Sequence, residues 1–176
     1  NTQDDLGRLL STVLKNSGQS TLNSHAYQLN EGHQRTNQTF TAGNYVDYTY
    51  DNIGQLKTAK GWESDTTTAR KQEQFGYGYD AAWNLNKRTN NALIHTFNAN
   101  NLNELTTITR ANSYTVAGSV STNPTSVTVK DNANSAVAAT VYGDNTFARD
   151  SVTLLDGNNT FTAIAQDNLS RKDTNV

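Results

Sequence analysis

Polar and apolar residues alternate one by one through most of the chain, between short groups of Gly, Asn and Asp. For example, Val46, Tyr48 and Tyr50 alternate with Asp47 and Thr49. A period of two is that of a β-strand, whose successive side chains point to opposite faces of a sheet. This alternation predicts strands and turns without a break from about residue 8 to residue 110. Strands joined in sequence by hairpins form an antiparallel meander.

A seven-residue pattern recurs at the predicted turns: aromatic–Asp–x–x–Gly–x–Leu. "YDNIGQL" fits it fully, "YDAAWNL" has Trp in the Gly position, and "QDDLGRL" lacks only the aromatic residue. "LNEGHQR" is a weak copy, and "FNANNLNEL" is a copy with two extra residues. The predicted structural motif residues are Asp4, Gly7, Leu9, Tyr50, Asp51, Gly54, Leu56, Tyr79, Asp80, Trp83, Leu85, Phe97, Asn98 and Leu105.

Each residue type in this pattern has a physical reason to be there. An Asp or Asn side chain accepts backbone N–H bonds and starts a turn. Gly supplies a backbone conformation that other residues resist. The aromatic ring and the Leu are expected on the buried face of the sheet. Trp83, in the Gly position, is expected either to distort its turn or to place its ring on the surface.

The pattern changes near Ala111, where the aromatic–Asp turn disappears. Short β-branched strands follow with Gly, Asn and Asp turns, and Val127 and Val129 alternate with polar residues. These features predict a small immunoglobulin-like β-sandwich. The predicted fold class is therefore all-β, with a sheet strip over residues 1–112 and a sandwich over residues 113–176. About 60 residues is marginal for an independent core, so the sandwich is expected to lean either on the preceding sheet or on a further strand after Val176.

Composition narrows the classes of function. Charged residues make up 17% of the 176 residues and the formal net charge is −2, which lacks the basic character of a nucleic-acid-binding face. Cys is absent, so no disulfide, thiol nucleophile or cysteine metal site is expected. No apolar run is long enough for membrane insertion. Neither nucleic acid nor membrane is an expected partner.

No catalytic, cofactor-binding or metal-binding residue is predicted. Asp51 and Asp80 could be read as an acid–base pair, but their identical place in a repeat favours turn capping. The three histidines lie at unrelated positions without metal-ligand spacing. Asp- and Asn-rich loops at residues 131, 143 and 156 lack the spacing of a calcium loop and are read as hairpin turns.

The Tyr and Trp residues allow two interpretations. They could form a stacking platform for a sugar, or they could pack on one side of the sheet, which the alternation favours. Trp62 ends a strand beside a loop and is expected to be the most exposed of these rings.

Two segments resemble known families. "YTYDNIGQLKTA" and "YGYDAAWNLNKRTN" resemble the tyrosine–aspartate (YD) repeats of the RHS family, over roughly residues 3–110. The stretch from "VTVKDN" to "TAIAQD" resembles the small Ig-like bacterial domain named after glucodextranase domain B. The first resemblance implies a secreted or cell-surface protein, mostly bacterial, whose repeats build long sheet strips in shells or stalks. The family's self-cleaving core segment has no counterpart in these residues.

The expected function is a structural module of an extracellular bacterial YD-repeat protein that builds a β-sheet shell, stalk or fibre without catalysis. An adhesion or carbohydrate-binding surface module is the alternative, with surface glycans as partners. An enzyme is the third class. A flat meander has two open edges. The expected partners are therefore further YD repeats of a longer parent chain, or neighbouring copies joined edge to edge in a homo-oligomer or fibre.

Overall fold

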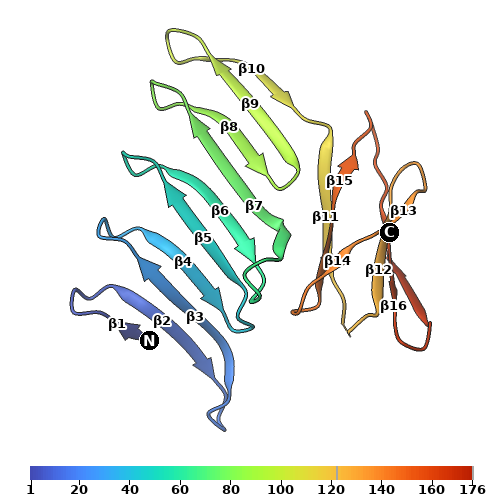
Figure 1. Ribbon diagram of the computed structural model, residues 1–176. Coiled ribbons are helices and arrows are strands. Elements are labelled where there is room, and N and C mark those ends of the chain that lie inside the picture. The colour runs from blue at the N-terminus through green and yellow to red at the C-terminus, as the bar shows by residue number, and fades with distance from the viewer. Residues whose placement is uncertain (122, 176) are drawn as a thin grey trace. The chain divides into compact units, whose positions relative to one another are not determined.

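The computed structural model describes residues 1–121 and 123–175, and every element in these ranges is a strand. The predicted all-β class is confirmed, and β1 to β10 follow one another in chain order in an antiparallel sheet (Figure 1). These strands are β1 (Thr2–Gln3), β2 (Leu9–Lys15), β3 (Thr21–Leu29), β4 (Arg35–Phe40), β5 (Tyr45–Tyr50), β6 (Leu56–Trp62), β7 (Ala69–Tyr79), β8 (Leu85–Asn90), β9 (Leu93–Ala99) and β10 (Leu105–Arg110).

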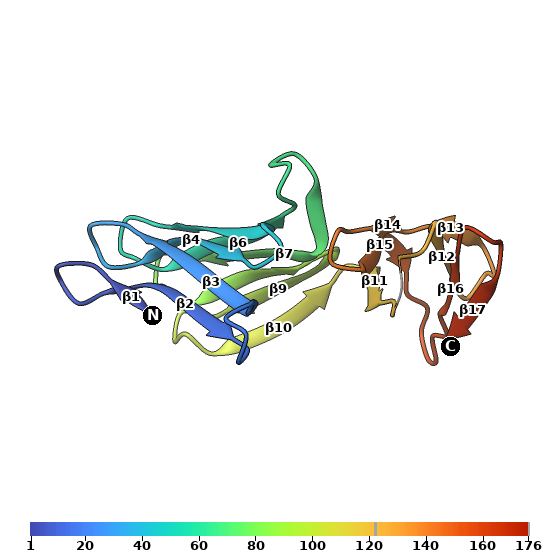
Figure 2. The same ribbon diagram turned by 90° about the horizontal axis from the view of Figure 1, so that it is seen from below.

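The remaining strands form two smaller sheets, which we call the two-sheet module. One sheet has the order β11-β15-β14 and the other β13-β12-β16-β17, and they form separate layers in Figure 2. The strands are β11 (Ser113–Ser119), β12 (Ser126–Lys130), β13 (Ala136–Ala138), β14 (Thr140–Val141), β15 (Thr146–Thr153), β16 (Thr162–Gln166) and β17 (Lys172–Asn175).

The chain divides into two compact units, residues 1–69 and residues 70–176. The first unit holds β1 to β6, and the second holds β7 to β10 together with the two-sheet module. The predicted boundary at residue 112 falls between the end of β10 at Arg110 and the start of β11 at Ser113. That residues 1–112 and 113–176 are separate domains stays a prediction.

The hydrophobic core lies in the two-sheet module. Val127, Val129 and Phe147 are buried there, and smaller apolar side chains from both sheets pack against them. In the described part of the first unit, by contrast, Ala59 is the buried apolar side chain, and Gln38 and Asn44 are buried polar ones. The meander is therefore held together mainly by its backbone ladder and by polar contacts.

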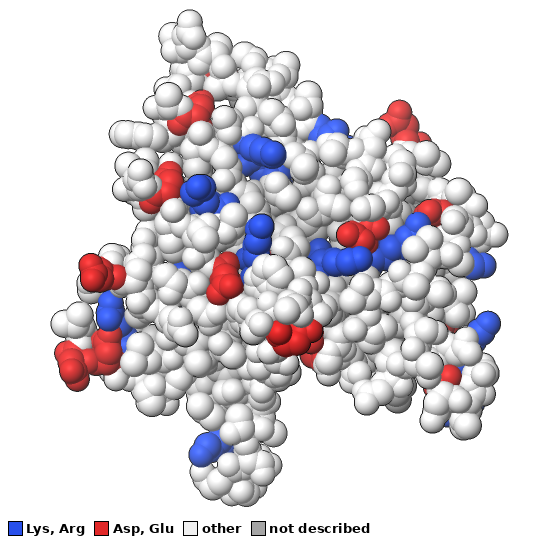
Figure 3. All heavy atoms as spheres, viewed as in Figure 1, with Lys and Arg blue, Asp and Glu red and all other residues white. Residues whose placement is uncertain are grey.

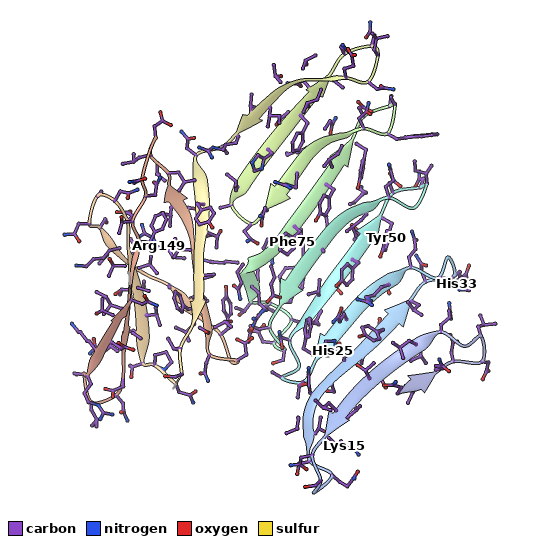
Figure 4. All side chains as sticks on the ribbon, turned by 180° about the vertical axis from the view of Figure 1, so that it is seen from behind. Lys15, His25, His33, Tyr50, Phe75 and Arg149 are labelled. Carbon is purple, nitrogen blue, oxygen red and sulfur yellow. The ribbon has the colours of Figure 1, made fainter. Side chains whose placement is uncertain are left out.

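The leucines of the turn motif differ from their expected burial. They were expected on a buried face, yet Leu9, Leu85 and Leu105 are all exposed. The expectation was wrong for these three, because no second layer of described residues covers them. The aromatic residues Tyr48 and Tyr50 in β5, in contrast, are half-buried. Figure 4 shows Tyr50 and His25 on strands of the sheet and His33 at a turn.

Charges of both signs are scattered over the surface. Lys and Arg are interspersed with Asp and Glu on the face drawn in Figure 3. None of the elements described is a helix suited in length and hydropathy to span a bilayer.

Candidate functional site

Every copy of the turn pattern has the same backbone hydrogen bonds. In the third copy Gly54 donates its N–H to the carbonyl oxygen of Asp51 at 3.1 Å, and Asp51 donates to that of Gln55 at 2.9 Å. Gly54 has a φ of 89°, in the left-handed region. A hairpin closed in this way has three loop residues, the last of them left-handed. The following strand carries an extra residue, which shifts the register between Thr49 and Tyr50.

The Asp side chain caps this turn. One carboxylate oxygen of Asp51 accepts the N–H groups of Ile53 at 3.0 Å and Gln55 at 2.8 Å. Asp4 and Asp80 accept the corresponding pairs in their own turns. The side-chain amide of Asn84 is the main cause that lowers the pKa of Asp80, with help from the Asn84 backbone. The geometry supports turn capping by these carboxylates.

Trp83 keeps the turn geometry and exposes its ring. Its φ is 65°, and its N–H still reaches the carbonyl oxygen of Asp80 at 3.0 Å. Trp83 is 68% exposed. Of the two alternatives stated for this position, the surface ring is the one adopted. Trp62, which was expected to be the most exposed ring, is only partly exposed, because it lies opposite Tyr45 within the β5–β6 pair.

The fifth turn begins two residues later than the sequence alignment placed it. Asn103, with a φ of 61°, donates to Asn100 at 3.0 Å, and the Asn100 side chain accepts the N–H of Leu102 at 2.8 Å. Asn98 instead lies in β9 opposite Thr107. The copy therefore has no inserted residues, and Ala99 occupies the aromatic position. The prediction was wrong because it placed the turn after the Phe97 ring, whereas the position of the turn depends on the capping side chain of Asn100.

The same turn recurs in the two-sheet module, where the sequence analysis expected it to disappear. Asp167 accepts the N–H groups of Leu169 and Arg171, each at 2.9 Å, and Ser170 is left-handed with a φ of 63°. Asp131 caps a second such turn, so its loop is a hairpin. The available signal was the Asp followed three residues later by Asn or Ser, without the preceding ring.

Side chains connect neighbouring turns of the meander, in contacts that we call the turn ladder. The residue after the left-handed position makes this contact. Arg8 donates to the Asn30 carbonyl oxygen at 3.2 Å, and Gln34 donates to that of Gly54 at 3.0 Å. In the second unit, Asn84 donates to the Asn103 side chain at 3.0 Å. The sequence pattern had treated this position as variable.

A polar–aromatic cluster lies on one face of the first unit. The guanidinium of Arg35 lies 4.3 Å from the Tyr27 ring centroid and 6.0 Å from that of Tyr48. Arg35 also donates to the buried Gln38 side chain at 2.7 Å, and Gln38 contacts His25 at 3.0 Å. Cation–π contacts and hydrogen bonds here replace an apolar core.

The aromatic motif residue contributes to this face. The Tyr50 hydroxyl donates to the Arg35 carbonyl oxygen at 2.8 Å, which joins β5 to the start of β4. Burial is the main cause that raises the pKa of Tyr50. The phenol therefore stays protonated and remains a donor.

Arg70 forms a buried ionic joint between β7 and the two-sheet module. Its side chain is 2% exposed and donates to Glu73 and Asp144, each at 2.8 Å. It also reaches the Thr146 hydroxyl at 3.1 Å and lies 4.9 Å from the Tyr142 ring centroid. Burial acts to raise the pKa of Asp144, but hydrogen bonds from Thr146 and Arg70 outweigh it and lower the pKa.

Lys71 adds two contacts to the joint. Its N–H donates to the Tyr142 hydroxyl at 2.8 Å, and its ammonium group pairs with Asp150 at 2.8 Å. The predicted leaning of the C-terminal strands on the sheet thus occurs through charged residues. The sequence held no signal for it, because Arg70 and Asp144 lie in segments without a shared motif.

The histidines occupy three separate elements. His25 is in β3, His33 is a left-handed turn residue with a φ of 62°, and His95 in β9 stacks on Phe97 with centroids 6.1 Å apart. Within residues 1–121 and 123–175, no group of three or more His, Cys, Asp or Glu residues is placed to hold a metal ion.

An open groove of about 790 Å³ lies in the two-sheet module. Val116, Val120, Phe147, Phe161 and Ala163 form its apolar lining, and Asp167, Arg171 and Lys172 lie at its polar rim. Arg171 is paired with Asp167 at 2.6 Å. The groove is lined by the core residues Val127 and Phe147 and by residues of β11 and β17, which are edge strands of the two sheets.

Comparisons with known proteins add little to this geometry. No family model matches the chain, and no curated protein matches it. Among solved structures, it is similar to a chain in the crystal structure of TcdB2-TccC3-Cdc42, with a TM-score of 0.42 and 13% identity. The similarity covers 93% of this chain but 9% of that one.

Proposed function

We propose that this chain is a structural module of an extracellular bacterial YD-repeat protein, building a β-sheet shell, stalk or fibre and performing no catalysis. The observation that carries the proposal is the turn ladder. Arg8, Gln34 and Asn84 each connect one hairpin to a neighbouring hairpin. A strip held in this way can extend without a central core, as repeat proteins do when each repeat contacts its neighbours.

The use of the carboxylates supports the same proposal. The carboxylates of Asp4, Asp51 and Asp80 accept hydrogen bonds from backbone N–H groups of their turns. Asp144 and Glu73 neutralise the buried Arg70. These groups therefore serve the architecture and are poorly suited to proton transfer. The Ig-like character of the C-terminal module and the secreted location belong to the proposal through the sequence resemblance.

Imaging of the native assembly tests the structural role. Cryo-electron microscopy of the parent protein should show strands spaced about 4.8 Å apart that continue past β1 or β10. Isolated copies with no neighbouring sheet at either edge would contradict the proposal. A hydrolase or transferase activity that purifies with the chain and is lost in a point variant would contradict it as well.

The exposed indole of Trp83 favours one alternative, an adhesion module that binds surface glycans. Aromatic rings on a surface can stack on apolar faces of ligands. A glycan array should then show binding that Trp83→Ala abolishes and that Trp62→Ala, at a less exposed ring, retains. An array without any bound sugar would eliminate this alternative.

A further inference from the structure

Strand β10 presents an open edge. It is the last strand in the order of the sheet, and its registered partner is β9. All six residues from Leu105 to Arg110 are exposed. In Figure 1 the strand lies at the outer side of β9.

The backbone register shows which groups face outward. Ala111 donates its N–H to the Ile94 carbonyl oxygen at 2.8 Å, and Arg110 lies opposite His95. Backbone groups of an antiparallel strand alternate between its two sides. Ile108 and Arg110 therefore direct their N–H and C=O groups away from β9.

This edge has little of the protection that natural edge strands carry. Protected edges are short, charged, kinked by bulges or interrupted by proline. From Leu105 to Thr109 the strand has neither a charge nor a proline, and its register shift lies close to the turn, between Leu105 and Thr107. Ile108, which is 56% exposed, lies in the regular part of the strand.

We propose that β10 pairs antiparallel with β10 of a second copy, about a two-fold axis at Ile108. In this register Ile108 lies opposite its own equivalent, and Thr107 lies opposite Thr109 of the second copy. Paired apolar and paired Thr side chains both stabilise neighbouring strands. The inference rests on the proposed structural function, because it names the partner and the edge through which the sheet grows.

Charge complementarity selects this partner and this direction. The segment reads Glu-Leu-Thr-Thr-Ile-Thr-Arg from Glu104 to Arg110, with opposite charges at its two ends. Antiparallel pairing brings the Arg110 end of each copy next to the Glu104 end of the other, so opposite charges lie close together at both ends of the pair. Parallel pairing would place like charges together. The two-sheet modules follow β10 at its C-terminal end, so they leave the strand pair at opposite ends.

A single cysteine tests the register, since the chain has no cysteine of its own. Directly opposed residues in a hydrogen-bonded pair have Cα atoms about 5.5 Å apart, which suits a disulfide. Ile108→Cys should therefore form a disulfide-linked dimer under mild oxidation. Leu14→Cys is the matched control, because Leu14 is an apolar residue 60% exposed on β2, near the other edge of the sheet.

We expect the Ile108→Cys chain to yield at least roughly tenfold more dimer than Leu14→Cys at equal low micromolar concentration, because its thiols are held within bonding range. In the Ile108→Cys background, Arg110→Glu should suppress the dimer and Glu104→Lys with Arg110→Glu should restore it. Equal yields from the two cysteine variants, or a yield insensitive to Arg110→Glu, would overturn the proposal.

Far-UV circular dichroism distinguishes lost pairing from lost folding in each variant. The outcome is also separate from the imaging test of the structural function. A strip seen without cross-linking at residue 108 would refute the β10 pair alone. Cross-linking at residue 108 in a native protein whose sheet ends at the β10 pair, with no shell, stalk or fibre, would refute the structural function alone.

Discussion

The guanidinium of Arg70 lies 2.8 Å from the carboxylate of Asp144, although the two residues are 74 positions apart. The covalent path between them runs through β8, β9 and β10 before it enters the two-sheet module. The pair therefore connects β7 directly to the module, while the short link at Ala111 and Asn112 connects β10 to it. Burial of the cation makes this connection depend on its carboxylate partners.

Replacement of Arg70 by Met should weaken this joint. The change leaves Asp144 and Glu73 without their cation, while Met fills a similar volume. We expect a loss of about 2 kcal/mol in the free energy of unfolding, below the usual cost of breaking a fully buried pair because both carboxylates retain some solvent. Urea denaturation followed by tryptophan fluorescence measures this change.

The control for this prediction is Arg88→Met. Arg88 is exposed on β8, and substitutions at such positions usually change stability by less than about 0.5 kcal/mol. Equal losses in the two variants would mean that the joint at Arg70 contributes nothing specific.

Asp65 should titrate far below the ordinary range. The Thr68 hydroxyl, at 2.6 Å, is the main cause, followed by backbone N–H groups of Thr68 and Thr67, and together they lower the pKa of Asp65 from 3.8 to about 2. A folded-state pKa below the unfolded value means that the ionised carboxylate favours folding. This contribution is present above about pH 4 and is lost as the pH falls towards 2.

Carbon-detected NMR of the side-chain carboxyl group measures this titration directly. Thr68→Val removes the hydroxyl and should move the Asp65 midpoint up towards 3.8, while Thr68→Ser should preserve the low value. A midpoint near 3.8 in the unmodified protein would show that this turn does not hold the charge as described.

Trp83→Gly should stabilise the protein. A left-handed residue other than Gly costs about 1 kcal/mol, and the exposed indole has few contacts to lose. We expect a gain of about 0.5 kcal/mol or more in the free energy of unfolding after the greater flexibility of Gly in the unfolded chain is allowed for. Thermal melting would show the gain as a higher midpoint.

Gly7→Ala is the reciprocal experiment. Gly7 has a φ of 76°, and an added Cβ would meet no atom within 4 Å, so the variant isolates the backbone term. It should lose about 1 kcal/mol. A destabilised Trp83→Gly variant would indicate that the indole makes contacts worth more than the backbone strain.

Gly118→Ala should disturb the core of the two-sheet module. A Cβ at this position would lie 2.9 Å from two atoms of the Phe147 ring, which is buried and cannot move away easily. Overpacking of this kind costs about 2 kcal/mol. The second substitution Phe147→Leu in the Gly118→Ala background should recover part of the loss. Chemical denaturation of Gly118→Ala, Phe147→Leu and the double variant measures the three losses in the free energy of unfolding. A double-variant loss equal to the sum of the two single losses would exclude this clash.

Some features followed from local sequence because their causes are local. Alternation with a period of two produced the strands around Tyr48. Asp51 and Gly54 supplied the cap and the left-handed backbone of their hairpin within a few residues. At Asn100 the turn has Asn in the Asp position and no preceding aromatic ring. The pattern therefore predicted the turn two residues too early, after the ring of Phe97.

The tertiary structure decided everything that depends on which turns and strands become neighbours. The contact from Gln34 to Gly54 and the joint between Arg70 and Asp144 join segments with no shared motif. Exposure of Leu105 and Ile108 likewise depends on what covers a strand, and alternation cannot report that. The sequence alone determined a polar meander with capped hairpins, because those interactions close within a single turn. Long-range ionic and backbone contacts required the folded chain, because their partners are selected by the packing of distant segments.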